Sequence, residues 1–457
     1  MTGIVLGSII GFLTLSSAFY LYSYAVEQSL KKTRQKFLSR IDNALALQQN
    51  SMYDDALKIY EEIAATITRN SRQDSFRDIY ALCKYGKGKC FQRKSIENAE
   101  FYNRAIQNYE EFLRCLPPAD GDMEKRLKKI ETYCSLGTLY TAFAKEVKTK
   151  DQAAYLKRAE TLLSSALTDI DVVKTQGSPL KGSAYRELFS AAGYAAVQQA
   201  LGTVYVELAD TETRSNAVRS LTKAVDIYDA ALQTYTIEEY PLEHTTILKA
   251  KTAALKKLFY LTKEIPYMDS ALNVLKTLAD HVGKSGQPLE LFAVLQDLGD
   301  STMLIIEHLD TASEGDQDKE ALYAMLLDAA GHYERMLQLY HEKDLFLTNN
   351  EVASIYKRLG SIKTKLYYLK YEDTLLEEGI ALYQKALGHT AEASLDFALV
   401  HSIVGDLYVV LSRLHNRKEN IAKAKKAYSV AIKAYDNLGM TSDKQSVEQS
   451  VKSIDGW

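Results

Sequence analysis

The residue types that most often bind metals or transfer protons are scattered in this sequence. All eight histidines lie between His244 and His415, and none forms an H-E-x-x-H motif or stands at i, i+4 within a carboxylate ligand set. A zinc site on a helix needs such spacing, because ligands one turn apart share a face. We therefore expect no metal site, and we expect His401 and His415 to be surface or groove residues.

Two glycine-rich stretches resemble phosphate-binding loops, GKGKC at 86–90 and GKSGQ at 283–287. Both lack the G-x-x-x-x-G-K-[ST] spacing, and neither follows a predicted strand. The sequence has no G-x-S-x-G elbow and no Cys-His pair in a favourable context. These absences predict a protein that is not an enzyme and that carries no cofactor.

The four cysteines fall within 52 residues, at Cys83, Cys90, Cys115 and Cys134. Cys83 and Cys90 are two helical turns apart, about 10 Å on a straight helix. A disulfide needs Cα atoms within about 7 Å. We interpret all four as reduced thiols on helix faces, which fits a reducing compartment.

The elements that position these residues are predicted to be helices throughout. The 457 residues include only six prolines, and Val, Ile and Thr show no alternating pattern. The composition is 46% hydrophobic and 25% charged, as in globular proteins. The net charge of −3 offers no basic field, so nucleic acid is not expected as a partner.

A short pattern recurs along the chain: a small residue, then an aromatic or Leu four residues later, then an apolar residue three further on. The first example is Ala56, Tyr60 and Ile63 in DDALKIYEEI. The small residues that open the pattern are Ala56, Ala105, Ala159, Ala224, Ala271, Ala329, Gly379 and Ala424. Most of these segments follow a helix with Leu-Gly or a near relative, as in SLGTLY, ALGTVY and IVGDLY.

These helix pairs predict a solenoid, because neither helix can bury its apolar face alone. The stretch GDLYVVLSRLHNRKENIAKAKKAYSVAIKAY, with Gly405, Tyr408, Ala424, Tyr428 and Ala431, resembles a tetratricopeptide repeat (TPR). The resemblance covers about residues 30–440, although the units exceed the typical 34 residues. The expected fold is an all-α solenoid of about eight TPR-like helix pairs preceded by one transmembrane helix.

The resemblance implies that a peptide or partner helix binds along a concave surface lined by the first helix of each pair. The residues that this implies are Lys87, Thr138, Thr141, Gln199, Thr203, Lys357, Ser402 and Asp406. One variety of the family clamps a C-terminal carboxylate with an Asn directly after the first-helix glycine. Thr203 and Asp406 occupy that position here, so such a clamp is disfavoured.

The first 26 residues carry no charged side chain, and Lys31, Lys32, Arg34, Lys36 and Arg40 follow. About 20 apolar residues cross a bilayer as a helix, and the positive-inside rule then places the C-terminal side in the cytoplasm. We predict a permanent anchor with the short N-terminus outside. The alternatives are a cleaved signal and a buried helix, but no basic residue precedes the apolar core.

Gly3, Gly7 and Gly11 form a double G-x-x-x-G stripe within this segment. Such a stripe lets a second membrane helix approach closely, either from a second copy or from another membrane subunit. The predicted domains are an anchor at 1–27, a helical array at 28–440, and a capping helix and tail at 441–457. No break by Pro or Gly is present between the anchor and Gly86, so the span is expected to continue into the first helix of the array.

Together these features predict a non-enzymatic, membrane-anchored adaptor that recruits a protein or peptide partner at the cytoplasmic face. Two other interpretations remain open from the sequence. One is a structural or assembly subunit of a membrane complex, docked through the glycine stripe. The other is a receptor for precursor proteins, since an N-terminal anchor with a cytosolic array also resembles mitochondrial import receptors.

Overall fold

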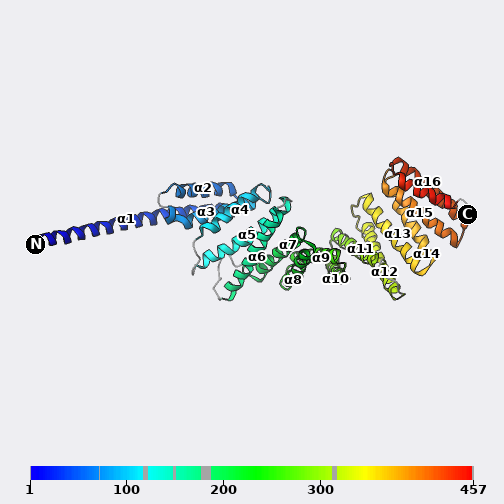
Figure 1. The fold of residues 1–457 in the computed structure, drawn as a ribbon, viewed down its shortest axis with the longest axis horizontal. Coiled ribbons are helices and arrows are strands. Elements are labelled where there is room, and N and C mark those ends of the chain that lie inside the picture. Colours follow the sequence, from blue (N-terminus) through cyan, green and yellow to red (C-terminus); the bar gives the residue numbers. More distant parts are fainter. Residues whose placement is uncertain are drawn as a thin grey trace. The chain divides into compact units, whose positions relative to one another are not determined.

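The computed structural model describes residues 2–70, 73–116, 122–147, 151–175, 187–310 and 316–454, and for residues 2–21, 73, 147, 310 and 316–318 it describes the backbone only. Within these ranges the chain is helical, with no strand, and the fold is all-α (Figure 1). The helices are α1 (Thr2–Gln49), α2 (Tyr53–Thr68), η1 (a short 3-10 helix, Gln73–Phe76), α3 (Arg77–Lys94), α4 (Phe101–Cys115), α5 (Met123–Val147), α6 (Gln152–Thr175), α7 (Ala191–Ala209), α8 (Arg214–Leu232), α9 (Pro241–Thr262), α10 (Ile265–Ser285), α11 (Pro288–Asp310), α12 (Asp316–Glu342), α13 (Asn349–Lys370), α14 (Asp373–Leu387), α15 (Leu395–Leu414), α16 (Arg417–Asn437) and α17 (Thr441–Ile454).

Most odd-numbered helices pack against the even-numbered helix that follows, as in α3 with α4, α7 with α8 and α15 with α16. The recurring sequence pattern lies on the even-numbered helices from α2 to α16, as expected for second helices of TPR-like pairs. Its members are almost fully buried; Ala56, Tyr60 and Ile63 of α2, for example, each have 0% exposure. The TPR-like helix-pair fold predicted from the pattern is therefore present.

Local sequence signals account for several helix ends. The side chains of Ser190, Thr348 and Ser394 each accept a hydrogen bond from a backbone N–H in the first turn of the following helix. Thr348 also completes a capping box with Glu351. Helix α10 ends at Gly286, whose φ of 69° lies in the left-handed region that glycine adopts without strain.

The chain divides into two compact units, residues 1–250 and residues 251–457. The sequence predicts one array over 28–440. The boundary falls inside α9, and α9 has no glycine of the kind that marks the other first helices.

Helix α1 is unbroken from Thr2 to Gln49, as the absence of Pro and Gly after the apolar segment predicts. Its C-terminal part packs beside α2 and α3 (Figure 1). The side chains of residues 22–25 are exposed. Phe37 is buried with its ring edge-on to Phe76, at 5.5 Å between centroids. Arg34 pairs with Asp78 of α3, and Arg40 pairs with Glu62 of α2. The base of α1 is thus the first helix of the first pair.

One helix among the residues whose side chains the structure describes, α15, has the length and composition to cross a membrane. Its apolar side chains have a place within unit 2, because Val400, Val404 and Leu407 are buried in a cluster with residues of α14 and α16. The predicted anchor at 1–27 lies mostly outside the described side chains. Gly3, Gly7 and Gly11 lie within α1, in the part whose surroundings are not described.

Unit 2 ends with α17, which packs on α16. Val447 and Ile454 of α17 are buried in one cluster with Tyr428 and Tyr435 of α16. The apolar face of the last pair is therefore covered within the chain.

Candidate binding groove

Each described helix pair with a first-helix glycine brings a ring or a leucine side chain against that glycine. A Cβ added at Gly202, Gly299 or Gly405 would lie 2.5–2.7 Å from the ring of the paired tyrosine, closer than side chains approach. The pairs are Gly88 with Tyr109, Gly137 with Leu163, Gly202 with Tyr228, Gly299 with Tyr333, Gly360 with Tyr383, and Gly405 with Tyr428. The missing side chain therefore sets the distance between the two helices of a pair.

In two pairs the residue directly after the glycine accepts a hydrogen bond from the tyrosine hydroxyl. Tyr333 Oη donates to Asp300 Oδ1 at 2.6 Å, and Tyr428 Oη donates to Asp406 Oδ1 at 2.6 Å. In α7 the Thr203 hydroxyl lies 3.5 Å from the Tyr228 hydroxyl. This position, where a carboxylate clamp would place Asn, is thus engaged in contacts within the pair.

Two cavities follow the faces of successive first helices in unit 1. A cavity of about 430 Å³ lies between α3 and α5, and a second of about 360 Å³ lies between α5 and α7. Glu131 and Thr138 of α5 line both cavities, so the two adjoin along α5. We name this feature the α3–α5–α7 groove. Its defining residues are Lys89, Gln92 and Arg93 of α3, Glu131, Cys134 and Thr138 of α5, and Ala196, Val197 and Ala200 of α7.

The charges in this groove are only partly neutralised. Glu131 accepts hydrogen bonds from Lys89 Nζ, at 2.9 Å, and from the Tyr85 hydroxyl. Arg93 and Glu187 are exposed side chains that line the groove, and neither forms an ion pair or hydrogen bond through its charged group with another residue that the structure describes. The groove therefore offers a cation beside α3 and a carboxylate beside α7.

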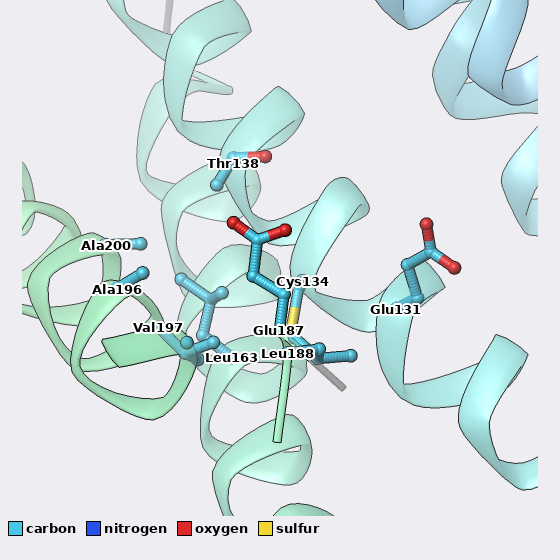
Figure 2. A pocket seen from close by; sticks show the side chains of 10 residues that line it. Glu131, Cys134, Thr138, Leu163, Glu187, Leu188, Ala196, Val197 and Ala200 are labelled. Carbon is cyan, nitrogen blue, oxygen red and sulfur yellow. The ribbon is translucent and has the colours of Figure 1, made fainter. Parts of the chain in front are cut away.

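The α5–α7 cavity has mainly apolar walls (Figure 2). Leu163, Leu188, Val197 and Ala200 line the cavity. Burial raises the pKa of the Cys134 thiol to about 12, so the thiol stays neutral at pH 7 and acts as a further apolar wall. Figure 2 shows the Glu187 carboxylate turned toward Thr138.

Unit 2 has a smaller counterpart of about 280 Å³ between α11 and α13. Its charged groups already have partners, because Asp300 accepts the Tyr333 hydroxyl and lies 3.4 Å from Nε of Arg358. Among the residues that the structure describes, no group of three or more His, Cys, Asp or Glu side chains is placed to hold a metal ion.

The groove residues implied by the TPR resemblance lie on first helices, but most do not face a cavity. Thr138 lines the groove, whereas Thr141 is buried and donates to the Gly137 carbonyl at 2.8 Å. Lys87 pairs with Glu61 of α2 at 3.0 Å.

The remaining implied residues are also largely occupied within the chain. Lys357 pairs with Asp396 of α15, and Asp406 accepts the Tyr428 hydroxyl. Thr203 donates to the Gln199 carbonyl at 3.1 Å. The Gln199 side chain and Ser402 are half-buried.

The sequence pattern did not predict three of the groove residues, Lys89, Arg93 and Glu187. The sequence pattern places Lys87 in the groove because it follows Gly86. The glycine of α3 that meets the tyrosine of α4 is instead Gly88, so Lys89 and Arg93 are the α3 residues that line the groove. Tyr109, the tyrosine of the pattern on α4, packs on Gly88, and this pairing fixes the register. Glu187 lies in the segment before α7, and no sequence pattern signals it.

No protein-family model matches the chain, and no curated protein matches it. Among solved structures, the chain is similar to a circular tandem repeat protein at 16% identity and TM-score 0.32, covering 93% of this chain and 99% of that one. It is also similar to the apo form of RapI at 11% identity and TM-score 0.36, covering 89% and 99%. The apo quorum sensor NprR from B. thuringiensis matches at 13% identity and TM-score 0.30, covering 92% and 99%.

Proposed function

We propose that this protein is a non-enzymatic, membrane-anchored scaffold. Its α3–α5–α7 groove binds a segment of a partner protein, and its N-terminal helix holds that partner at the cytoplasmic face of a membrane. The bound partner gains effective concentration at the bilayer, which raises its encounters with other membrane components without a new contact.

The α3–α5–α7 groove is the observation that carries this proposal. It combines apolar walls with two charged groups, Arg93 and Glu187, that have no partner among the described residues. Protein sites for extended ligands typically combine an apolar surface with a few placed polar groups. The groove also crosses three successive first helices, which is long enough for several residues of a bound segment.

Sequence and backbone together support the anchor. Helix α1 is continuous through the uncharged segment. Tyr22 and Tyr24, near the C-terminal end of that segment, are 65% and 54% exposed. Tyrosine side chains favour the headgroup layer. Arg34 and Arg40 are tied to Asp78 and Glu62 within unit 1, as described above. Lys31 pairs with Glu27 at 2.8 Å, so Lys32 and Lys36 are the exposed basic side chains left to meet headgroups.

The glycine stripe of Gly3, Gly7 and Gly11 gives the proposed anchor a surface for a second membrane helix. The ion pairs at the base of α1 join the anchor to the first helix pair without a flexible linker. A partner in the groove would then be held close to the bilayer.

The groove is tested by selecting displayed 12-residue peptides on the immobilised full chain and on two variants in which an alanine is replaced by tryptophan. Ala196→Trp fills the groove on α7, and Ala230→Trp places the same side chain on exposed α8, outside the groove. We expect the parent chain and Ala230→Trp to select the same peptides, and Ala196→Trp to lose them. Equal selection by all three chains would contradict groove binding.

The anchor is tested by alkaline carbonate extraction of membranes from cells that express the full chain or a chain lacking residues 2–27. We expect the full chain to stay in the pellet and the shortened chain to move to the supernatant. Protease added to intact vesicles should then digest the array only when it faces the added enzyme. Release of the full chain by carbonate would contradict anchoring.

A further inference from the structure

The third helix pair departs from the glycine–tyrosine pattern at one position. Gly137 of α5 faces Leu163 of α6, whereas Gly202 and Gly405 face Tyr228 and Tyr428. A leucine is shorter than a tyrosine and carries no hydroxyl. Leu163 therefore leaves open the space beside Thr138, the residue that follows Gly137, and the cavity of about 360 Å³ lies there.

This cavity has a defined chemistry. Its walls are apolar, with Leu163, Leu188, Val197 and the neutral Cys134 thiol. Its charged residues are both acidic, Glu131 and Glu187, and no Lys or Arg among the described residues lines it. Glu131 pairs with Lys89 and accepts a hydrogen bond from the Tyr85 hydroxyl, so Glu187 is the carboxylate left to meet a ligand.

We propose that the α5–α7 cavity binds an arginine or lysine side chain of the partner protein. The proposal rests on the groove function above and adds the chemistry of one ligand residue. The methylene stem lies along Leu163 and Val197, and the cationic end pairs with Glu187 beside the Thr138 hydroxyl (Figure 2). Long basic side chains bury their stems while the charged end stays at a polar rim.

Other ligand residues fit this cavity less well. A wholly apolar side chain would cover the Glu187 carboxylate without giving it a partner, and removing a charge from water without compensation is costly. An acidic side chain would meet Glu187 as a like charge. The charge complementarity of the cavity therefore favours a basic residue over both.

The experiment compares peptide selection by the full chain with selection by three variants and one control. Leu163→Tyr restores the pattern of the other pairs and fills the cavity, with Thr138 placed as Thr203 is for Tyr228. Glu187→Gln removes the charge and keeps the shape. Glu187→Lys reverses the charge. The control, Glu239→Gln, removes an exposed carboxylate between α8 and α9.

The parent chain and Glu239→Gln should enrich peptides with Arg or Lys at one position. A synthetic copy of a selected peptide should bind Glu187→Gln about threefold more weakly and Leu163→Tyr about tenfold more weakly, because the stem loses its apolar contact. Replacing the basic residue of the peptide by norleucine should weaken binding to the parent chain but not to Glu187→Gln. Glu187→Lys should shift the enrichment to Asp or Glu at that position.

Two results would overturn the proposal, and they differ in what else they remove. If the parent chain selects peptides that Ala196→Trp loses, but without a basic position and with no effect of Glu187→Lys, the ligand residue is wrong and the groove function stands. If the parent chain selects no peptide above the Ala196→Trp level, both proposals fail. Should Leu163→Tyr not fold, the two Glu187 variants decide the outcome.

Discussion

The ring of Tyr428 lies directly against the backbone of Gly405, so that a Cβ at residue 405 would be 2.5 Å from Cε1 of the tyrosine. The same tyrosine donates its hydroxyl to Asp406, the next residue on α15. The Tyr428 side chain thus contacts two consecutive positions of α15. Its ring requires glycine at the first position, and its hydroxyl requires a hydrogen-bond acceptor at the second. This relationship repeats between Tyr333 and the Gly299–Asp300 pair.

Substitution of Gly405 by alanine should destabilise unit 2. The added methyl group would overlap a ring that is only 2% exposed, and overpacking of this kind costs about 1–3 kcal/mol. The control is Gly331→Ala on α12, where nothing lies within 4 Å of the added Cβ. That change should stabilise by up to about 1 kcal/mol through helix propensity. Urea unfolding of both variants checks the prediction, and equal effects would contradict it.

Removal of the Tyr428 hydroxyl should cost less than the glycine substitution but should still be measurable. Tyr428→Phe keeps the ring and loses the 2.6 Å bond to Asp406, which we expect to lower the free energy of unfolding by about 1 kcal/mol. Tyr228→Phe is the matched control, because its hydroxyl lies 3.5 Å from Thr203. Chemical denaturation should therefore show a larger loss in the free energy of unfolding for Tyr428→Phe than for Tyr228→Phe. The reverse order would show that the short bond contributes little.

The packing of the C-terminal part of α1 against unit 1 should depend on the buried ring of Phe37. Phe37 is 6% exposed and packs edge-on to Phe76, so Phe37→Ala should destabilise unit 1 by about 3 kcal/mol. The neighbouring Leu38 is 36% exposed, and Leu38→Ala should cost much less. Denaturation and limited proteolysis of α1 in both variants measure the difference. Similar losses at the two positions would contradict docking of α1 through Phe37.

The helix pairs could be predicted from the sequence because their signal is local and repeated. Ala424 and Tyr428 stand one turn apart on α16, and Gly405 marks the facing helix, so three residue types suffice to recognise a pair. The register on α3 could not be fixed in this way. Gly86 and Gly88 are both present there; Gly86 meets Tyr60 of the preceding pair, and Gly88 meets Tyr109 of its own pair.

The groove was less predictable than the pairs, because it depends on residues from different repeats. Lys87 and Lys89 are equally basic in sequence, but Lys87 pairs with Glu61 behind the groove and Lys89 pairs with Glu131 inside it. Glu187 reaches the cavity from a segment between helices, where no periodicity applies. Leu163 satisfies the sequence pattern, which allows an aromatic or Leu at this position, so the open cavity beside it is visible only in the structure.

Stability should fall in mild acid because of His401. Its Nδ1 is buried without a hydrogen-bond partner in the described part of the chain, the Phe397 ring lies 4.5 Å away, and burial lowers the pKa of His401 below its ordinary 6.5. The unfolded chain therefore binds a proton at a higher pH than the folded chain does. The folded state keeps its full stability above the ordinary pKa and loses stability as the pH falls through it, until the folded pKa is reached.

Urea midpoints between about pH 7.5 and about pH 5 measure this loss. His401→Gln should flatten the curve, while substitution of the exposed His341 is the control; an unchanged slope in His401→Gln would show that other groups cause the acid sensitivity.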